Sequence, residues 1–364
     1  MVSLALPLQV LAAALGDHFQ NLPLATGPLL EFHFELQRFI KLADALTEHT
    51  LFDIERGEVA SADDTPEPDA ADLFGTAQLP LPAARDAVFS LRNVVPARFL
   101  RPRFAGFHAC TLFSATLGPP AYATDLLGLP DNRAWIDVPP VFAPEHLAVR
   151  VAQRVSTRWA HRTRSLRTLT GVLVQQFDAQ PGNYLAFFSS FEYLQQAAAQ
   201  LALQRPDIPQ WRQDRQMGAD ARQAFLRRFE PGGCGIGFAV LGGVFAEGVD
   251  LPGSRLIGAF IATLGLPPVS PLQDAVQARL AQLFGADAGY ADLVPAMQKV
   301  VQAAGRVLRT PQDRGWLWLL DDRYASPEVQ RLLPAWWRIG MHPPPVASSG
   351  AGYDEAMGYP MESA

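Results

Sequence analysis

The sequence predicts an α/β protein in which a parallel sheet with helices on both faces follows a mainly helical segment. Between residues 185 and 320, short apolar runs typical of buried strands alternate with helical stretches, which favours a parallel sheet. Before residue 56, apolar residues recur at three- and four-residue spacing, as on one face of a helix. These residues are Leu29, Phe32, Leu36, Phe39, Ala43 and Leu46.

Length and composition exclude several classes of protein. The 364 residues, 49% of them hydrophobic, are enough for two or three domains with cores, and the net charge of −6 gives no global nucleic-acid signature. Cys110 and Cys234 are too few for a disulfide framework or an iron–sulfur cluster, and they indicate a reducing compartment. Residues 1–15 are apolar but lack a basic start, so they predict a buried helix and not a signal peptide.

No run reaches the roughly 18 apolar residues of a membrane span, and the seven histidines show no metal-binding spacing. We therefore expect a cytoplasmic protein with no membrane association and no metal ligands of its own.

We expect four regions along the chain. Residues 1–86 form a helical segment with an acidic, proline-bearing exposed loop at 61–72. Residues 87–118 contribute two short buried strands, Ala87–Leu91 and His108–Phe113, whose sheet is mostly absent from this sequence. Residues 119–340 form the main α/β domain. Residues 341–364, rich in Gly, Ser and Pro, form a disordered tail.

Within the main domain, the pattern predicts strands near 185–188, 236–241, 256–261 and 316–320, and a helix over 192–203. Four arginines fall at successive four-residue steps, which predicts a basic stripe on one helical face. A solvated face is favoured over a phosphate-tracking one. The four are Arg150, Arg154, Arg158 and Arg162.

The sequence holds no P-loop. Lys41 and Lys299 are the only lysines among 30 basic residues, and neither follows the pattern Gly-x-x-x-x-Gly-Lys-Ser/Thr. The run from Trp316 to Asp322 imitates a Walker B strand without a Walker A partner, and we expect Asp321 or Asp322 to pair with Arg323. The glycines of 232–237 precede their strand and miss the dinucleotide fingerprint, which disfavours a Rossmann oxidoreductase.

The stretch from Gln302 to Arg309 is the leading candidate site. On a helix, Arg306 and Arg309 lie three residues apart on one side, Gln302 lies one turn before Arg306, and Gly305 removes a side chain between them. Two forked guanidiniums on a bare face suit the charge that spreads over a phosphoryl group during transfer. The alternative is a solvated helix end whose arginines favour the helix dipole.

Three other short stretches place small or acidic residues where strands are predicted to end. Ser114-Ala115-Thr116 is either a relay between two sites or an ordinary helix cap. Ser189-Ser190 follows the strand at 185–188. The glycine-rich run from 242 to 253 lets backbone approach phosphate, unless it is only a turn with solvated carboxylates. Its candidate residues are Gly243, Glu247, Gly248 and Asp250.

These stretches resemble the motifs of one helicase family in order and spacing. Gln-x-x-Gly-Arg-x-x-Arg at 302–309 is similar to motif VI of superfamily 2 helicases, and 243–253 is similar to motif V of the DinG/XPD-like branch. The run 112–117 resembles motif III, and 182–190 resembles motif IV. The resemblance covers about residues 88–340, and more weakly the helical residues before them, which resemble the end of a helical arch.

The resemblance implies the C-terminal half of an ATP-dependent, 5′-to-3′ DNA helicase. Residues 87–118, with motif III, would be the terminal strands of its first RecA-like domain, and residues 119–340 its second RecA-like domain. By this resemblance, Arg306 and Arg309 contact the γ-phosphate, Gln302 contacts nucleotide or water, and Gly305 belongs to the part of the site that binds nucleotide. Motif V residues Glu247, Gly248 and Asp250 couple nucleotide to single-stranded DNA. The resemblance also assigns contact with nucleic acid, or coupling to it, to Gly243, Ser114, Ala115, Thr116, Ser189 and Ser190.

By the same resemblance, ATP and Mg²⁺ require an N-terminal P-loop half, from the same gene or a separate chain, so this chain alone is expected not to hydrolyse ATP. A different class of function stays open, namely a non-catalytic module that binds nucleic acid or a partner with a helicase-derived fold. Copurification of a polypeptide with a P-loop favours the motor, and stable, monodisperse behaviour without one favours the module.

Overall fold

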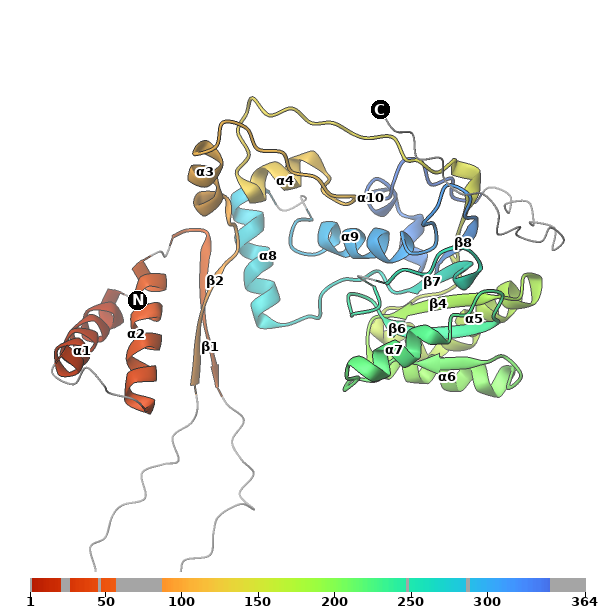
Figure 1. Cartoon of the computed structure of the whole chain (residues 1–364), viewed down its shortest axis with the longest axis horizontal. Coiled ribbons are helices and arrows are strands. Elements are labelled where there is room, and N and C mark those ends of the chain that lie inside the picture. The colour runs from red at the N-terminus through yellow and green to blue at the C-terminus, as the bar shows by residue number, and fades with distance from the viewer. Residues whose placement is uncertain are drawn as a thin grey trace, which may run out of the picture. The chain divides into compact units, whose positions relative to one another are not determined.

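The computed structural model describes residues 2–20, 27–44, 47–56, 87–246, 249–285 and 289–340. The chain divides into two compact units, which we describe one at a time (Figure 1). The first unit comprises residues 1–112, 120–133 and 268–291, and the second comprises 113–119, 134–267 and 292–364. Residues 120–133 and 268–291 therefore cluster apart from the rest of the predicted domain 119–340, and residues 113–118 cluster with it. The predicted acidic loop 61–72 and tail 341–364 lie outside the described residues.

The first unit is mainly helical. Helices α1 (Val2–Gln20) and α2 (Pro28–Asp44) pack against each other, as do α3 (Ala97–Ala105) and α4 (Pro120–Leu127). Helix α8 (Pro271–Phe284) contacts strand β1 (Thr50–Arg56), and the Arg279 guanidinium donates to the Thr50 carbonyl at 3.3 Å. The helical prediction for the start of the chain is confirmed in α1 and α2. Burial of the first helix is not, because Leu6 and Val10 are mostly exposed.

Two predictions for the first unit were wrong. The helical pattern was extended to residue 55, but Thr50–Arg56 is strand β1, paired antiparallel with β2 (Ala87–Asn93). A cross-strand ion pair between Arg92 Nε and Asp53 Oδ1, 2.8 Å apart, stabilises this ribbon. The predicted strand Ala87–Leu91 therefore belongs to a two-stranded ribbon and not to a parallel sheet.

The predicted strand His108–Phe113 is also absent. These residues have no regular secondary structure, and the Phe113 side chain is 91% exposed. A buried strand needs hydrogen-bonded neighbours on both sides, and the described residues place no strand beside this one.

The second unit is built on a six-stranded parallel sheet of order β3-β8-β7-β4-β6-β5. This confirms the α/β class. The four predicted strands are present as β4, β6, β7 and β8. The strands are β3 (Leu147–Val151), β4 (Asn183–Phe188), β5 (Gln210–Arg212), β6 (Gly235–Val240), β7 (Gly258–Ala262) and β8 (Gly315–Leu319).

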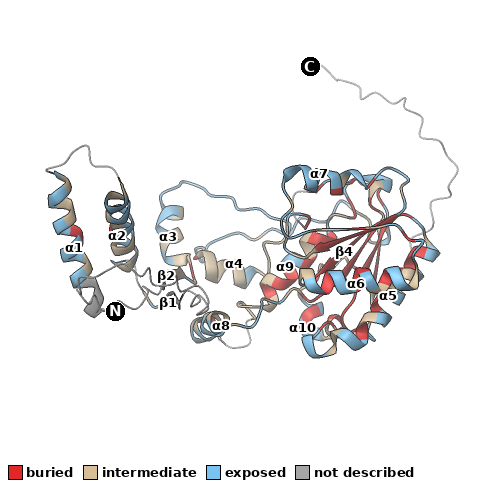
Figure 2. Ribbon diagram, turned by 90° about the horizontal axis from the view of Figure 1, so that it is seen from below, coloured by how far each residue is buried: buried red, intermediate tan, exposed pale blue. Residues whose placement is uncertain are grey.

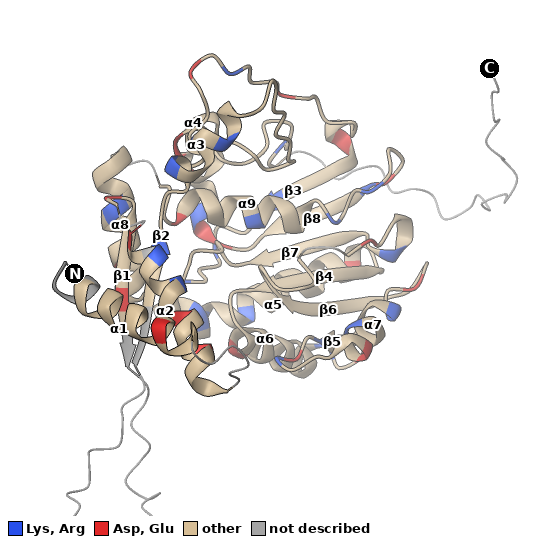
Figure 3. Ribbon diagram, turned by 60° about the vertical axis from the view of Figure 1, so that its left-hand side comes forward, with Lys and Arg blue, Asp and Glu red and all other residues tan. Residues whose placement is uncertain are grey.

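Helices cover both faces of this sheet. Helices α5 (Arg162–Ala179) and α6 (Phe191–Gln204) bury residues against one face. Helices α7 (Ala219–Arg227), α9 (Leu293–Ala304) and α10 (Pro327–Gln330) contribute to the core on the other. Single 3₁₀ turns lie at Pro144–His146, Trp159–His161, Gly253–Arg255 and Asp322–Ala325. The four central strands carry no charged residue, as Figure 3 shows.

Strand residues alternate between the two cores with the period of two that a pleated sheet imposes. In β4, Leu185 and Phe187 join the core under α9, whereas Tyr184 and Phe188 join the core under α5 and α6. Both faces of the central strands are therefore buried, which Figure 2 shows as a red sheet between half-red helices. This is why the strands read as continuous apolar runs in the sequence.

The predicted arginine-striped helix was wrong. Residues 147–151 form edge strand β3, whose first three residues are buried against β8. Arg150 lies with its guanidinium carbon 5.1 Å and 5.4 Å from the ring centroids of Trp316 and Trp318. The four arginines consequently have separate environments.

No helix among the described residues is long and apolar enough to cross a bilayer.

Candidate nucleotide and nucleic-acid site

The candidate residues of the second unit gather where its parallel strands end. Ser189 and Ser190 follow β4, and Gly242 and Gly243 follow the neighbouring strand β6. In open parallel sheets, ligands bind outside the carboxyl ends of the strands. Motifs IV and V, far apart in sequence, thus share one edge of the sheet.

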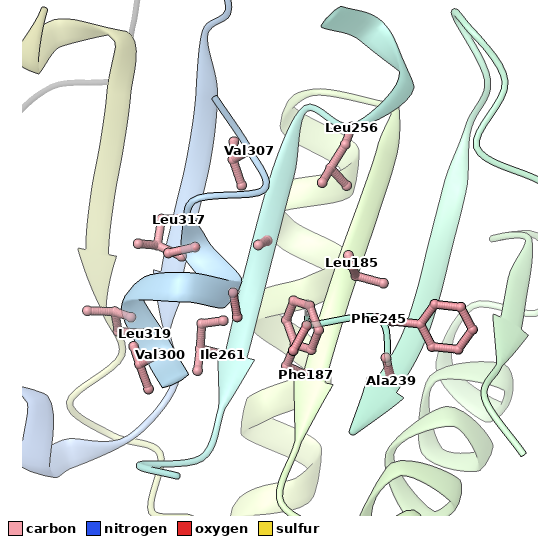
Figure 4. Packing of buried hydrophobic residues seen from close by; sticks show 14 of the residues in the cluster. Leu185, Phe187, Ala239, Phe245, Leu256, Ile261, Val300, Val307, Leu317 and Leu319 are labelled. Atoms are coloured by element: carbon pink, nitrogen blue, oxygen red, sulfur yellow. The ribbon is translucent and has the colours of Figure 1, made fainter. Parts of the chain in front are cut away.

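Buried side chains fix the motif V loop to the core of the second unit. Gly242 turns the chain with φ of +77°, a conformation that favours glycine, and Ala246 N donates to the Gly243 carbonyl at 2.9 Å. Phe245 is 1% exposed and packs in the core with Phe187 and Ala239 (Figure 4). Anchoring holds the backbone of this loop in place. Glu247 and Gly248 lie outside the described residues.

Motif VI differs from the prediction in one respect, because Arg306 and Arg309 are not on a helix. Helix α9 ends at Ala304, Gly305 is its C-cap, and Arg306 N and Val307 N donate to carbonyls three residues back. Asp313 then accepts hydrogen bonds from the backbone N–H groups of Arg309 and Thr310, at 2.7 and 2.8 Å, and turns the chain away.

The sequence pattern concealed this end of the helix. Val300, Ala303, Ala304, Val307 and Leu308 keep helical spacing, and all five are buried. The last two reach the core from a turn and not from a helix. Figure 4 shows Val300 and Val307 pointing into the same core from either side of the helix end.

The two arginines nevertheless converge, and they converge on motif V. Arg306 donates from Nε to the Ala246 carbonyl at 3.1 Å and from Nη1 to the Val249 carbonyl at 3.0 Å. Arg309 donates from Nη2 to the same Val249 carbonyl at 2.6 Å. One backbone oxygen therefore accepts from both guanidiniums, and motifs V and VI form one arginine–carbonyl cluster, comprising Arg306, Arg309, Ala246, Val249 and Asp250.

Asp250 completes the cluster at its exposed side. Its carboxylate lies 3.2 Å from Arg309 Nε, with side-chain exposures of 74% for Asp250 and 30% for Arg309. An ion pair this exposed contributes at most about 1 kcal/mol to folding. The pair orients Arg309 more than it stabilises the domain.

Gln302 reaches motif III. Its Nε2 donates to Thr116 Oγ1 at 3.1 Å, and Gln298, one helical turn earlier, donates from Nε2 to the carbonyls of Thr116 and Gly118 at 2.9 and 3.2 Å. Gln298 was not predicted, although its spacing of four from Gln302 on α9 would have placed it on the same face. Helix α9 therefore holds motif III on one face, and motif V is held by the arginines just after it.

The other motif III residues contribute less. Ser114 Oγ accepts from Thr116 N at 3.1 Å within a turn, so these hydroxyls do not end a strand as predicted. Ser114 and Ala115 are exposed, and Thr116 is the member of the motif that contacts motif VI.

The two serines of motif IV have different environments. Ser190 is the N-cap of α6, and its Oγ accepts from Tyr193 N at 3.2 Å. Ser189 Oγ accepts from Arg162 Nη2 at 2.9 Å. Arg162, at the start of α5, also donates from Nε to the Thr157 carbonyl and lies over the Tyr193 ring. Its role could not be read from the sequence, because 27 residues separate it from Ser189.

A buried carboxylate lies beyond the end of β8. Asp321 is fully buried and accepts from Thr157 N at 2.9 Å, from the Thr157 hydroxyl, and from Arg323 Nε at 2.7 Å and Nη2 at 3.0 Å. Burial alone would raise the pKa of Asp321, but these hydrogen bonds and the Arg323 charge lower it to about 2. The predicted pairing with Arg323 is confirmed for Asp321, whereas Asp322 pairs with Arg158 at 2.7 Å.

Comparison with known proteins finds similar helicases. A family model described as a helicase C-terminal domain matches residues 173–340. A probable ATP-dependent helicase of Methanocaldococcus jannaschii is 32% identical over 172 residues, covering 42% of this chain and 25% of that protein. The ATP-dependent DNA helicase chl1 of Schizosaccharomyces pombe is 27% identical, covering 45% of this chain and 22% of that protein.

Solved structures share the fold. A structure titled XPD helicase superposes with a TM-score of 0.55 at 19% identity, covering 67% of this chain and 44% of its own. The chain spans about a quarter of the length of the curated relatives it matches, or less. A RecA-like fold, a matching family model and helicase relatives agree with one another: residues 173–340 match the helicase C-terminal domain, and the chain is similar to the C-terminal part of helicases of the XPD type.

Proposed function

We propose that this chain supplies the arginine-bearing half of an ATP-dependent helicase that moves 5′ to 3′ on single-stranded DNA. Arg306 and Arg309 contact the γ-phosphate, Gln302 contacts nucleotide or water, and motif V couples the nucleotide to DNA. A P-loop half, in the same polypeptide or a separate one, holds ATP and Mg²⁺. The observation that carries this proposal is the convergence of both arginines on the Val249 carbonyl of motif V.

The arrangement suits such coupling for a physical reason. A backbone carbonyl is a neutral acceptor, whereas a γ-phosphate is an anion that gives stronger, charge-assisted hydrogen bonds to a guanidinium. Donors that move from Val249 to phosphate release the backbone of motif V. Nucleotide binding would thereby change the loop that follows β6, at the edge where DNA is proposed to bind.

We propose that the contacts of motif III also change when nucleotide binds. Gln302 lies one turn before Arg306 and holds Thr116 by the side-chain contact described above. A shift at the end of α9 therefore changes this contact together with the arginine contacts. This gives Ser114, Ala115 and Thr116 their proposed place on the nucleic-acid side, along with Gly243, Ser189 and Ser190.

The test uses this chain together with a polypeptide that carries the P-loop half. Arg306→Ala should reduce kcat of DNA-stimulated ATP hydrolysis by about 10³-fold or more, the scale of losing an arginine finger. Arg306→Lys should fall nearly as far, because an ammonium lacks the planar fork. Arg314→Ala is the matched control, because Arg314 is exposed and lies only eight residues away.

Two results would contradict the proposal. One is an Arg306→Ala protein that keeps its kcat and loses affinity for single-stranded DNA. The other is DNA-stimulated ATP hydrolysis by the purified chain alone that disappears in Arg306→Ala. A chain that is monodisperse, binds DNA and never copurifies with a P-loop polypeptide would instead support a non-catalytic binding module.

A further inference from the structure

Trp159 is the exposed tryptophan of this protein. It lies in the 3₁₀ turn before α5 and is 74% exposed, whereas the six other tryptophans, all within the described residues, are buried or half-buried. A tryptophan ring in water forgoes the burial that stabilises it elsewhere in the protein. Its position is therefore better explained by a ligand than by packing.

The Trp159 ring is not alone on the surface. The guanidinium carbon of Arg162 lies 5.2 Å from the ring centroid of Trp159 and 4.9 Å from that of Tyr193. The same guanidinium donates to Ser189 Oγ at 2.9 Å and to the Thr157 carbonyl at 2.9 Å. Arg162 is thus held in one orientation between an exposed ring and the hydroxyl that follows β4.

A second pair of the same kind lies next to the Ser189–Ser190 turn. Phe191, the first residue of α6, has the guanidinium carbon of Arg215 at 5.5 Å from its ring centroid. Two pairs of an aromatic ring with an arginine therefore lie near the turn where β4 ends. We call this set the aromatic–arginine surface: Trp159, Arg162, Ser189, Phe191 and Arg215.

The charges around this surface favour an anion. The carboxylate of Asp322 is held by Arg158 at 2.7 Å, and Glu192 in the first turn of α6 accepts a hydrogen bond from Gln196 at 3.2 Å. Asp214, next to Arg215, accepts from Gln216 N at 3.2 Å. The charge of Asp322 is therefore offset by Arg158, whereas Glu192 and Asp214 are hydrogen-bonded to uncharged groups, and the amino end of the 14-residue helix α6 adds the positive end of its dipole.

We propose that the aromatic–arginine surface binds single-stranded DNA, with a base stacked on Trp159 and a neighbouring phosphate held by Arg162 and Ser189. Proteins that bind single strands combine these two elements, because every base has a π-face and every linkage has a charge. The surface lies beside the motif V loop at the carboxyl ends of the strands. The proposal rests on the proposed function and adds to it a base-stacking contact outside motifs III to VI.

The test is a titration of the purified chain against a fluorescein-labelled oligothymidylate, followed by fluorescence anisotropy at several salt concentrations. Trp159→Ala should raise Kd by about 5- to 100-fold, the range for loss of one stacked base, with the same dependence of log Kd on log salt as the parent. Arg162→Gln should also raise Kd, and it should reduce the magnitude of that slope by about 0.7, the value for one lost single-strand phosphate contact.

Two further variants separate stacking from a change of fold. Trp159→Phe keeps a ring, so its Kd should stay within a few-fold of the parent, and the quenching of tryptophan fluorescence by the oligonucleotide should be reduced. Leu203→Ala removes an equally exposed apolar side chain at the far end of α6 and should leave Kd unchanged. Unfolding temperatures should match throughout the Trp159 and Leu203 variants, because both side chains are exposed.

The outcomes distinguish the two proposals. Binding by the parent chain and equal binding by Trp159→Ala would overturn the role of Trp159 and leave the proposed function intact. A salt slope that falls in Trp159→Ala as much as in Arg162→Gln would overturn the stacking contact. A parent chain that does not bind the oligonucleotide even at low salt would overturn the proposal for this surface, whereas the proposed function is decided by the ATP-hydrolysis test with the P-loop half.

Discussion

Two arginine clusters of the second unit use the same residue types differently. In the Asp321 network, the Arg323 fork meets a carboxylate that is fully buried and also bonded to Thr157. In the arginine–carbonyl cluster, Arg306 and Arg309 share the Val249 carbonyl, and the carboxylate beside Arg309 is 74% exposed. A buried, paired charge cannot exchange partners cheaply, whereas donors on a backbone carbonyl can. The Asp321 network is therefore suited to stabilising the domain, and the arginine–carbonyl cluster is the one that we propose rearranges when nucleotide binds.

The largest effect on stability should come from the Asp321 network. Arg323→Ala leaves a buried carboxylate without its cation, which should lower the free energy of unfolding by about 3 kcal/mol. Asp322→Asn breaks the exposed pair with Arg158, whose side chains are 43% and 40% accessible, and should cost less than about 1 kcal/mol. Urea denaturation of both variants and the parent measures the difference. Equal losses would remove the contrast between a buried and an exposed pair.

The same network should make stability depend on pH in acid. The folded pKa of Asp321 is about 2, below the ordinary value of about 3.9, so the folded state favours the ionised carboxylate. Its contribution is therefore complete above about pH 4 and is lost as the pH falls from about 4 toward 2. The loss should be on the order of 2 kcal/mol.

Unfolding free energies measured between pH 2 and pH 5 test this dependence. Asp321→Asn has no carboxylate to protonate at this position, so its curve should be flatter than that of the parent. Curves that stay parallel over this range would mean that Asp321 has an ordinary pKa in the folded protein.

The central strands of the sheet could be predicted from the sequence, whereas edge strand β3 could not, and the difference is how deeply each strand is buried. Fully buried strands such as β4 and β7 are almost entirely apolar on both faces, so their composition identifies them in the sequence. Edge strand β3 is buried over only its first three residues and contains Arg150. The four-residue spacing from Arg150 to Arg162 resembles the spacing of one helical face. What identifies β3 is its pairing with β8, which lies more than 160 residues away.

In the candidate site, too, some features could be predicted from the sequence and others depend on contacts in the folded chain. The predicted strand ends located motifs IV and V, but the partners of each side chain depend on where the chain turns. Arg306 and Arg309 lie beyond the helix, which ends at Ala304, and Asp313 holds the turn that follows by accepting from two backbone N–H groups. The apolar spacing of Val307 and Leu308 conceals this helix end in the sequence. Gln298 and Arg162 lie outside the motif patterns, and contacts in the folded protein reveal them.

The smallest structural change tests the comparison most sharply. Asp250 is exposed, and removing an exposed partner of an ion pair should change the free energy of unfolding by no more than about 0.5 kcal/mol. If the arginine–carbonyl cluster only closes a turn, Asp250→Ala should have no other consequence. If the cluster couples two sites, Asp250→Ala should separate activities that normally occur together, because Arg309 loses the contact that orients it.

In the protein with its P-loop half, single-stranded DNA should still bind Asp250→Ala, because arginines and backbone amides make most phosphate contacts. Stimulation of ATP hydrolysis by that DNA should fall. The measurement is the rate of ATP hydrolysis with and without saturating DNA, beside a binding titration at the same salt concentration. Asp220→Ala, in the first turn of α7, is the control for removing one negative charge. Equal stimulation in Asp250→Ala and the parent would mean that motif V closes a turn and that coupling runs through other contacts, of which Gln302 to Thr116 is the next to test.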